Sequence, residues 1–148
     1  MQEAWSIVML ISGALFIAGV FPIAYERAPA WRRADDATFR TEFGHTLRRV
    51  DRLQPVLLLI SVVGAVGFAI SASGTAQTLA AAAALCLVAV LIGSGLRLVP
   101  IQRRLTDRAT SLSTKEVDHL RTRWLNCHLI RTIVSLLAFV LLVVAAGI

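Results

Sequence analysis

The sequence has little charge and few of the motifs that build common soluble active sites. Only 16% of its 148 residues are Asp, Glu, Lys or Arg, against about 25% in an ordinary soluble domain, whereas 57% are hydrophobic. Two cysteines, Cys86 and Cys127, cannot build a disulfide framework and are expected to be packing residues. No Cys-x-x-Cys, glycine-rich phosphate loop or Gly-x-Ser-x-Gly motif occurs. The composition therefore favours a membrane protein.

Four apolar runs are each close to the length of about 20 residues that a helix needs to cross a bilayer. They lie at about 4–25, 55–71, 79–96 and 127–147. Glycine, alanine and serine in these runs favour close contact between helices. We therefore predict one integral membrane domain over residues 1–148, an all-α bundle of four transmembrane helices. No Asp or Glu lies in these runs, which makes a transporter the least favoured function.

The basic residues are confined to two stretches. Seven of the 15 Lys and Arg lie in residues 26–52 and eight in residues 97–131, whereas residues 72–77 carry no charge. With four spans both basic stretches face one side, and the positive-inside rule predicts this side to be cytoplasmic and both termini to be external. The expected location is the plasma (inner) membrane, with the lipid bilayer as a partner. Because the net charge of +6 reflects topology, no nucleic-acid partner is predicted.

The first basic stretch is expected to hold an amphipathic helix at the cytoplasmic surface. Phe39, Phe43 and the apolar residues after them follow helical spacing, and Asp35 or Asp36 is suited to cap the start of the helix. Residues 28–33, which precede it, are expected to form a turn that places Trp31 at the membrane interface.

The second basic stretch is expected to hold a further surface helix and the start of the last span. Pro100 should break or kink the third helix, and residues 101–107 should stay helical beyond it. Ser113-x-x-Glu116 matches a capping box, which predicts the start of a helix that continues into the fourth span.

Polar residues collect at the start of the fourth apolar run. Trp124, His128 and Arg131 are spaced by four and three residues, so they share one face of a helix. If Ile148 reaches the far edge of the hydrocarbon, the helix rise of about 1.5 Å per residue places Arg131 a few Å inside the near edge. A cation at this depth is a candidate for a functional site.

Two interpretations of this face stay open. In a catalytic one, His128 transfers a proton, Arg131 stabilises an oxyanion and Trp124 stacks on a flat substrate. In a structural one, Trp124 is an interfacial aromatic, Arg131 extends to the head groups and His128 bonds a backbone carbonyl.

Two Glu-x-x-His motifs raise the alternative of a metal site. Glu42 with His45, and Glu116 with His119, have the spacing of the ligands in di-iron carboxylate bundles. Such a bundle needs a further Glu from each of two other helices; Glu26 is a candidate for one, but the third span offers no carboxylate. Glu116 is better explained by the capping box.

The last third of the chain resembles the anthrone oxygenase-like family of small four-span membrane proteins. The resemblance rests on Val99-Pro-Ile-Gln-Arg-Arg-Leu105, on Trp124-x-x-x-His128-x-x-Arg131 and on Ala138-Phe139 in an apolar helix. Some fungal members oxidise anthrones to anthraquinones in polyketide pathways, with no obvious cofactor. The resemblance implies a site at Trp124, His128 and Arg131, joined by Gln102 and Arg104 from the third helix. Gln102 stands where the family usually has Asn.

The resemblance implies a membrane-embedded oxygenase or oxidoreductase of secondary metabolism that acts on a hydrophobic aromatic molecule with O₂ as co-substrate and no cofactor. Its site is expected at the cytoplasmic end of the bundle, with Tyr25 and Glu26 as further substrate contacts. For these two, the alternative is an interfacial tyrosine beside a solvated Glu26–Arg27 ion pair. Two other functions stay open: a non-catalytic accessory subunit of a larger membrane complex, and a metal-dependent membrane enzyme. A homo-oligomer or a partner membrane subunit is compatible with the small-residue faces.

Overall fold

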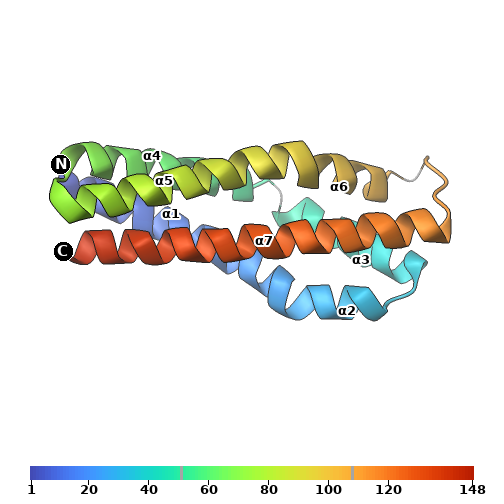
Figure 1. The fold of residues 1–148 in the computed structure, drawn as a ribbon. Coiled ribbons are helices and arrows are strands. Elements are labelled where there is room, and N and C mark those ends of the chain that lie inside the picture. Colours follow the sequence, from blue (N-terminus) through green and yellow to red (C-terminus); the bar gives the residue numbers. More distant parts are fainter. Residues whose placement is uncertain (51, 108) are drawn as a thin grey trace.

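Helices form every regular element in the part of the chain that the computed structural model describes, residues 1–50, 52–107 and 109–148. Four helical stretches are long and apolar enough to cross a membrane. They lie side by side in an elongated bundle, with both termini at the same end (Figure 1). The prediction of an all-α bundle of four long apolar helices is confirmed, and the chain is a membrane protein.

The first half of the chain forms two long helices, joined by a segment of shorter helices that lies outside the four-helix bundle. Helix α1 (Gln2–Pro22) continues through a π-helical turn, η1 (Ile23–Arg27), into the short α2 (Ala28–Arg33). Helix α3 (Asp36–Val50) then leads back towards the bundle, where α4 (Gln54–Ser71) begins. Proline in the first turn of α4 needs no hydrogen-bond partner there, as expected for Pro55.

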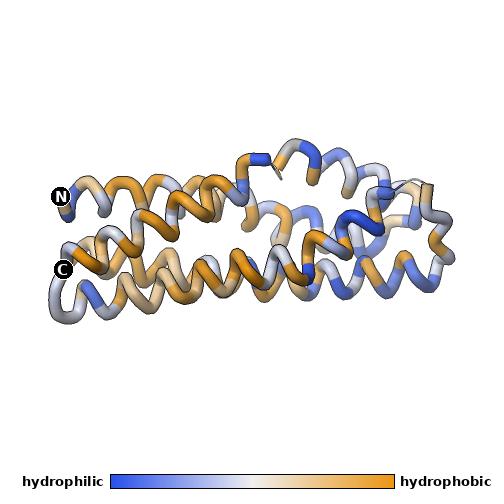
Figure 2. The backbone as a smooth tube through the Cα atoms, turned by 90° about the horizontal axis from the view of Figure 1, so that it is seen from above, coloured by the Kyte–Doolittle hydropathy of each residue, from blue (hydrophilic) through white to orange (hydrophobic). Residues whose placement is uncertain are grey.

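The second half also forms two long helices with a π-helical turn in the first of them, but no separate segment of short helices joins them. Helix α5 (Gly74–Gly93) continues through a second π-helical turn, η2 (Ser94–Leu98), into α6 (Val99–Thr106). Helix α7 (Thr114–Gly147) then runs unbroken to the terminal end. We call the end of the bundle that carries α2, α3 and α6 the loop end; polar residues are concentrated there, and apolar residues cover the other half (Figure 2).

Pro100 does not break the third long helix, which continues from Gly74 to Thr106. It lies in the first turn of α6, directly after the π-helical turn, where a proline is tolerated because the helical hydrogen-bond pattern changes there. The sequence predicted a break or a kink at Pro100. The break is wrong, because the helix is continuous there.

Small residues bring the helices together in the half of the bundle that carries the termini. A β-carbon added at Gly64 of α4 would lie 2.8 Å from the backbone nitrogen of Met9, so α1 and α4 are in backbone contact there. Over residues 74–84, the buried residues of helix α5 are all alanine, namely Ala76, Ala80, Ala83 and Ala84. This packing is the kind that membrane helices use in place of a hydrophobic driving force.

At the loop end the packing is aromatic. Trp31 is fully buried and contacts Phe39, Phe43 and Trp124 edge to face, with ring centres 5.3 to 6.1 Å apart. Residues 28–33 therefore form a helix and not a turn, and Trp31 is a core residue, which corrects the prediction of an interfacial tryptophan. The amphipathic helix is confirmed as α3, but its apolar face packs on the protein.

Side-chain hydrogen bonds at the N-termini of α3 and α7 fix where these two helices begin. The carboxylate of Asp35 accepts hydrogen bonds from the backbone N–H of Thr38 at 2.9 Å and from its hydroxyl at 2.7 Å, which identifies Asp35 as the cap of α3. These bonds hold the pKa of the Asp35 carboxyl below its ordinary value. At the start of α7, Ser113 and Glu116 form the predicted capping box.

We expect Gly64→Leu to destabilise the bundle, because the larger side chain has no space against the backbone of α1. Overpacking of this kind costs about 1–3 kcal/mol. Thermal unfolding of the detergent-solubilised protein, followed by helical circular dichroism, measures the effect. Gly93→Leu is the matched control, because a β-carbon there meets no atom within 4 Å. Equal melting temperatures for the two variants would contradict this account of the packing.

Candidate functional site

A cavity of about 340 Å³ lies inside the loop end, between η1, α4, η2 and α7. Its volume is at the lower end of the range of about 300–1,000 Å³ found for ligand pockets. Most of the wall is apolar and is formed by Phe16, Ile23, Leu47, Val50, Leu58, Leu91 and Leu98. The polar side chains in the wall include Gln54, Ser94, Gln102, Trp124 and Arg131. An apolar wall with a few convergent polar groups is typical of a small-molecule site.

Three polar atoms in this wall are buried without a hydrogen-bond partner among the described residues. They are Oε1 of Gln54, Oγ of Ser94 and Nε1 of Trp124. A buried polar atom without a partner costs about 1–3 kcal/mol, so such atoms are rare unless something else satisfies them. Together they offer acceptors and donors to a ligand that carries oxygen.

Gln54 owes its position to a glycine on the facing helix. A β-carbon at Gly19 of α1 would overlap the carboxamide of Gln54, so Gln54 can adopt this conformation only because residue 19 is glycine. Neither Gln54 nor Ser94 is predicted as a site residue from the sequence. Each is a polar residue at the loop end of an apolar run. Polar residues occur at the end of any helix that reaches a membrane surface, so this feature does not single them out.

Both π-helical turns lie against the cavity. Ile23 of η1 and Ser94 and Leu98 of η2 are in its wall. A π-helical turn adds a residue to one turn of a helix and is frequent at functional sites. Here the two turns direct wall residues of two helices towards the same space.

The structure brings Trp124, His128 and Arg131 together, as their spacing on one helix face predicts. Trp124 and Arg131 are in the wall of the cavity, and His128 contacts both of them from outside the wall. The imidazole of His128 stacks on the Trp124 indole, with ring centres 4.8 Å apart and planes at 10°. The other neighbours of this indole are aromatic edges, with Phe43 at 4.8 Å. Because one face of the indole is covered by His128 and aromatic edges surround the ring, Trp124 offers its N–H to a ligand and not a free ring face.

The hydrogen bonds of His128 define its tautomer. Its Nε2 lies 3.2 Å from the carbonyl oxygen of Val20, which can only accept, so Nε2 carries the proton. Its Nδ1 lies 3.1 Å from Nη2 of Arg131, which can only donate, so Nδ1 carries a lone pair. The imidazole in this arrangement is neutral, and it holds the guanidinium of Arg131 at the cavity. A ligand in the cavity would meet Arg131 before His128.

Three of the other predicted substrate contacts, Tyr25, Glu26 and Arg104, lie outside this cavity, whereas Gln102 does not. Tyr25 is 76% exposed and stacks on Phe21, with ring centres 5.8 Å apart, and Glu26 is exposed beside Arg27 at 3.9 Å. Arg104 faces a separate surface hollow at the start of α7. Gln102 is in the cavity wall. Helical spacing gives the face on which a residue lies, but not the helix that covers that face.

The residues of the two Glu-x-x-His motifs have other contacts. Glu42 accepts a hydrogen bond from Nε1 of Trp31 at 3.3 Å, and Glu116 closes the capping box. His45 and His119 are exposed. Over residues 1–50, 52–107 and 109–148, the structure contains no cluster of three or more His, Cys, Asp or Glu side chains that could hold a metal ion.

Comparison with known proteins identifies the family. The model of the family described as anthrone oxygenase matches residues 43–141, about two thirds of the chain. The matched stretch begins in α3 and ends in α7, so it contains every polar residue of the cavity wall named above. Comparisons with curated proteins and with solved structures gave no significant match. On the strength of the family match, the chain belongs to the anthrone oxygenase family.

Proposed function

We propose that the protein is a membrane oxygenase that binds a flat, apolar ketone of the anthrone type in the loop-end cavity and oxidises it with O₂. The observation that carries this proposal is the set of buried polar atoms on Gln54, Ser94 and Trp124, which lie in an otherwise apolar wall beside the His128–Arg131 pair. Membership of the family supports the reaction class.

The wall suits the two parts of such a substrate. The fused rings pack against the leucine, isoleucine and phenylalanine side chains, and the carbonyl oxygen accepts hydrogen bonds from Arg131 and from the indole N–H of Trp124. Both donors favour the enolate over the ketone, because they stabilise the negative charge that forms on the oxygen. A cation in an apolar cavity does this better than water does, since the local dielectric is low.

His128 completes the reaction as the base. When an N–H of Arg131 turns from Nδ1 to the substrate oxygen, the lone pair on Nδ1 is released and accepts a proton from the methylene carbon. The resulting carbanion is electron-rich and gives its electrons to O₂. The methylene becomes a second carbonyl, which takes one oxygen atom, and the other oxygen leaves as water with the two hydrogens.

The substrate reaches the cavity from the bilayer. A groove of about 340 Å³ lies on the outer face of the bundle. It is formed by α5 and η2 on one side and by α7 on the other, and its wall shares Ser94, Leu98 and Arg131 with the cavity wall. An apolar substrate that partitions into lipid would pass these three residues. We further propose that the loop end faces the cytoplasm, because the basic residues are concentrated there.

We expect the purified protein to consume O₂ in the presence of a simple anthrone, and His128→Ala to lower the rate by about 100-fold, as loss of a general base does. Arg131→Gln should lower it by a similar factor of about 100, because the enolate loses its cation. Oxygen-electrode measurements at equal protein concentration test both variants.

His119→Ala is the matched control, since His119 lies on the same helix but is exposed. It should keep the wild-type rate. Unchanged turnover in His128→Ala would contradict the proposed base. If the wild type neither binds nor oxidises the anthrone and co-purifies stoichiometrically with another membrane protein, the proposal fails in favour of an accessory subunit.

We expect the activity to need no metal. Protein dialysed against a chelator should keep its rate of O₂ uptake, and elemental analysis should find no stoichiometric Fe, Cu, Mn or Zn. Glu42→Gln should likewise keep the activity unless the fold of α3 is disturbed, which circular dichroism detects. Loss of activity on chelation, restored by one of these metals, would instead support the metal-dependent interpretation.

A further inference from the structure

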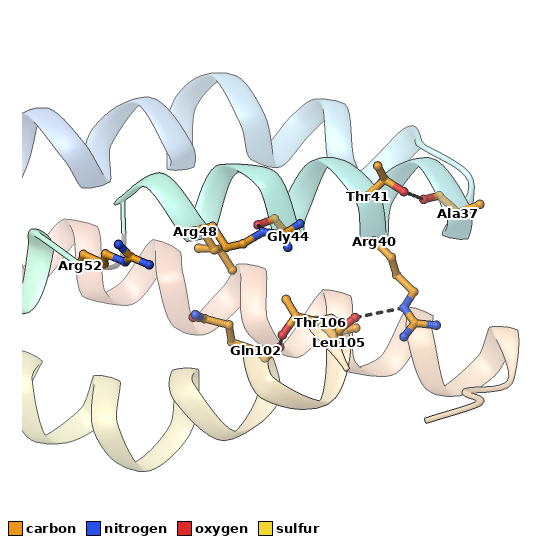
Figure 3. Close-up of a pocket in the computed structure, with 10 residues that line it drawn as sticks. Ala37, Arg40, Thr41, Gly44, Arg48, Arg52, Gln102, Leu105 and Thr106 are labelled. Carbon is orange, nitrogen blue, oxygen red and sulfur yellow. Dashed lines mark hydrogen bonds between the residues drawn. The ribbon is translucent and has the colours of Figure 1, made fainter. Parts of the chain in front are cut away.

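A second and larger hollow of about 710 Å³ lies between α3 and α6, next to the cavity. We call it the arginine cleft, because Arg40, Arg48 and Arg52 are in its wall. Figure 3 shows Arg48 on α3 and Gln102 on α6 at opposite sides of this cleft. Leu47 and Gln102 are in the walls of both hollows, so the cleft begins where the cavity ends.

The charge in the cleft is of one sign. No Asp or Glu is in its wall within the described ranges, and neither Arg48 nor Arg52 forms an ion pair with a described residue. Arg40 differs, because its guanidinium binds the carbonyl oxygens of Leu105 and Asp107 at the end of α6. Arg48 is on α3 and Arg52 lies two residues beyond the end of this helix, so the positive charge of the wall extends past α3.

Gly44 keeps the cleft open at the cost of helix stability. A glycine in the middle of a helix is less favourable than alanine by about 1 kcal/mol. Close packing does not require glycine at position 44. A β-carbon there would lie 3.8 Å from Nη2 of Arg48 and 3.9 Å from Cγ2 of Thr106, both ordinary contact distances. A longer side chain would occupy the space in front of Arg48. The Nε of Arg48 donates a hydrogen bond to the carbonyl oxygen of Gly44 at 3.1 Å, which holds the guanidinium over this glycine (Figure 3).

We propose that the arginine cleft binds an anionic group, a carboxylate in the first instance, carried by the same aromatic substrate whose rings lie in the cavity. This inference rests on the proposed function and narrows its substrate to an amphiphilic aromatic acid. Arginine suits the task because its planar guanidinium donates two parallel hydrogen bonds to a carboxylate. The shared wall at Leu47 and Gln102 lets one molecule reach both hollows.

Anaerobic equilibrium binding separates the cleft from the oxidation. The probes are anthrone and an anthrone with one carboxylate on an outer ring, added to the protein in phosphatidylcholine nanodiscs. We expect the wild type to bind the carboxylated compound about tenfold more tightly than anthrone, as a charge-assisted pair provides. Arg48→Gln with Arg52→Gln should abolish this preference and leave the Kd of anthrone unchanged.

Arg33→Gln is the matched control, because it removes one exposed positive charge at the end of α2, outside the cleft. It should keep the preference. A second variant, Gly44→Leu, should also abolish the preference by filling the cleft, with no loss of thermal stability. Equal Kd values for the two probes in the wild type, or a preference that survives in the double variant, would overturn the inference.

Two further measurements, native mass spectrometry and admission of O₂ after binding, distinguish the other outcomes. If the wild type shows no preference and native mass spectrometry finds phosphatidylglycerol that depends on Arg48 and Arg52, the anion in the cleft is a lipid head group and the substrate assignment is overturned. If the preference is present but neither probe is oxidised when O₂ is admitted, the anionic site stands and the proposed oxygenase function fails.

Discussion

The hydrogen bond between Arg131 and His128 is the interaction on which the loop end depends. A guanidinium near the hydrocarbon of a membrane needs a fixed partner, and here the partner is a neutral imidazole that is itself anchored to the carbonyl of Val20. The stack of His128 on Trp124 fixes the plane of this imidazole. Trp124 in turn contacts Trp31 of α2 and Phe43 of α3. Through these contacts α2 and α3 support the position of the histidine ring.

The two halves of the bundle are built on opposite rules. Near the termini, small residues such as Gly64 allow the backbones of α1 and α4 to touch. Near the loop end, large aromatic residues pack beside the cavity and hold Trp124 in its wall, and the π-helical turns place Ile23 and Ser94 there. A binding site needs supporting side chains that hold its polar groups in place, and the aromatic packing at the loop end provides this support.

Much of the fold could be predicted from local signals. Hydrophobic length predicted the four spans, the Ser113-x-x-Glu116 pattern predicted the start of α7, and helical spacing predicted that Trp124, His128 and Arg131 lie together. What could not be predicted depends on contacts between distant segments. Trp31 looks interfacial until α3 is folded over it, and Gln54 looks like an ordinary helix end until Gly19 is placed opposite.

If the substrate binds in the cavity beside Trp124, the indole N–H of this residue must respond to it. The sequence contains three tryptophans. With ¹⁵N-labelled indoles, anaerobic addition of anthrone should shift the N–H resonance of Trp124, which has no acceptor among the described residues, and leave that of Trp31 in place, because Glu42 already accepts its hydrogen bond. An unmoved Trp124 resonance at saturating anthrone would contradict the account.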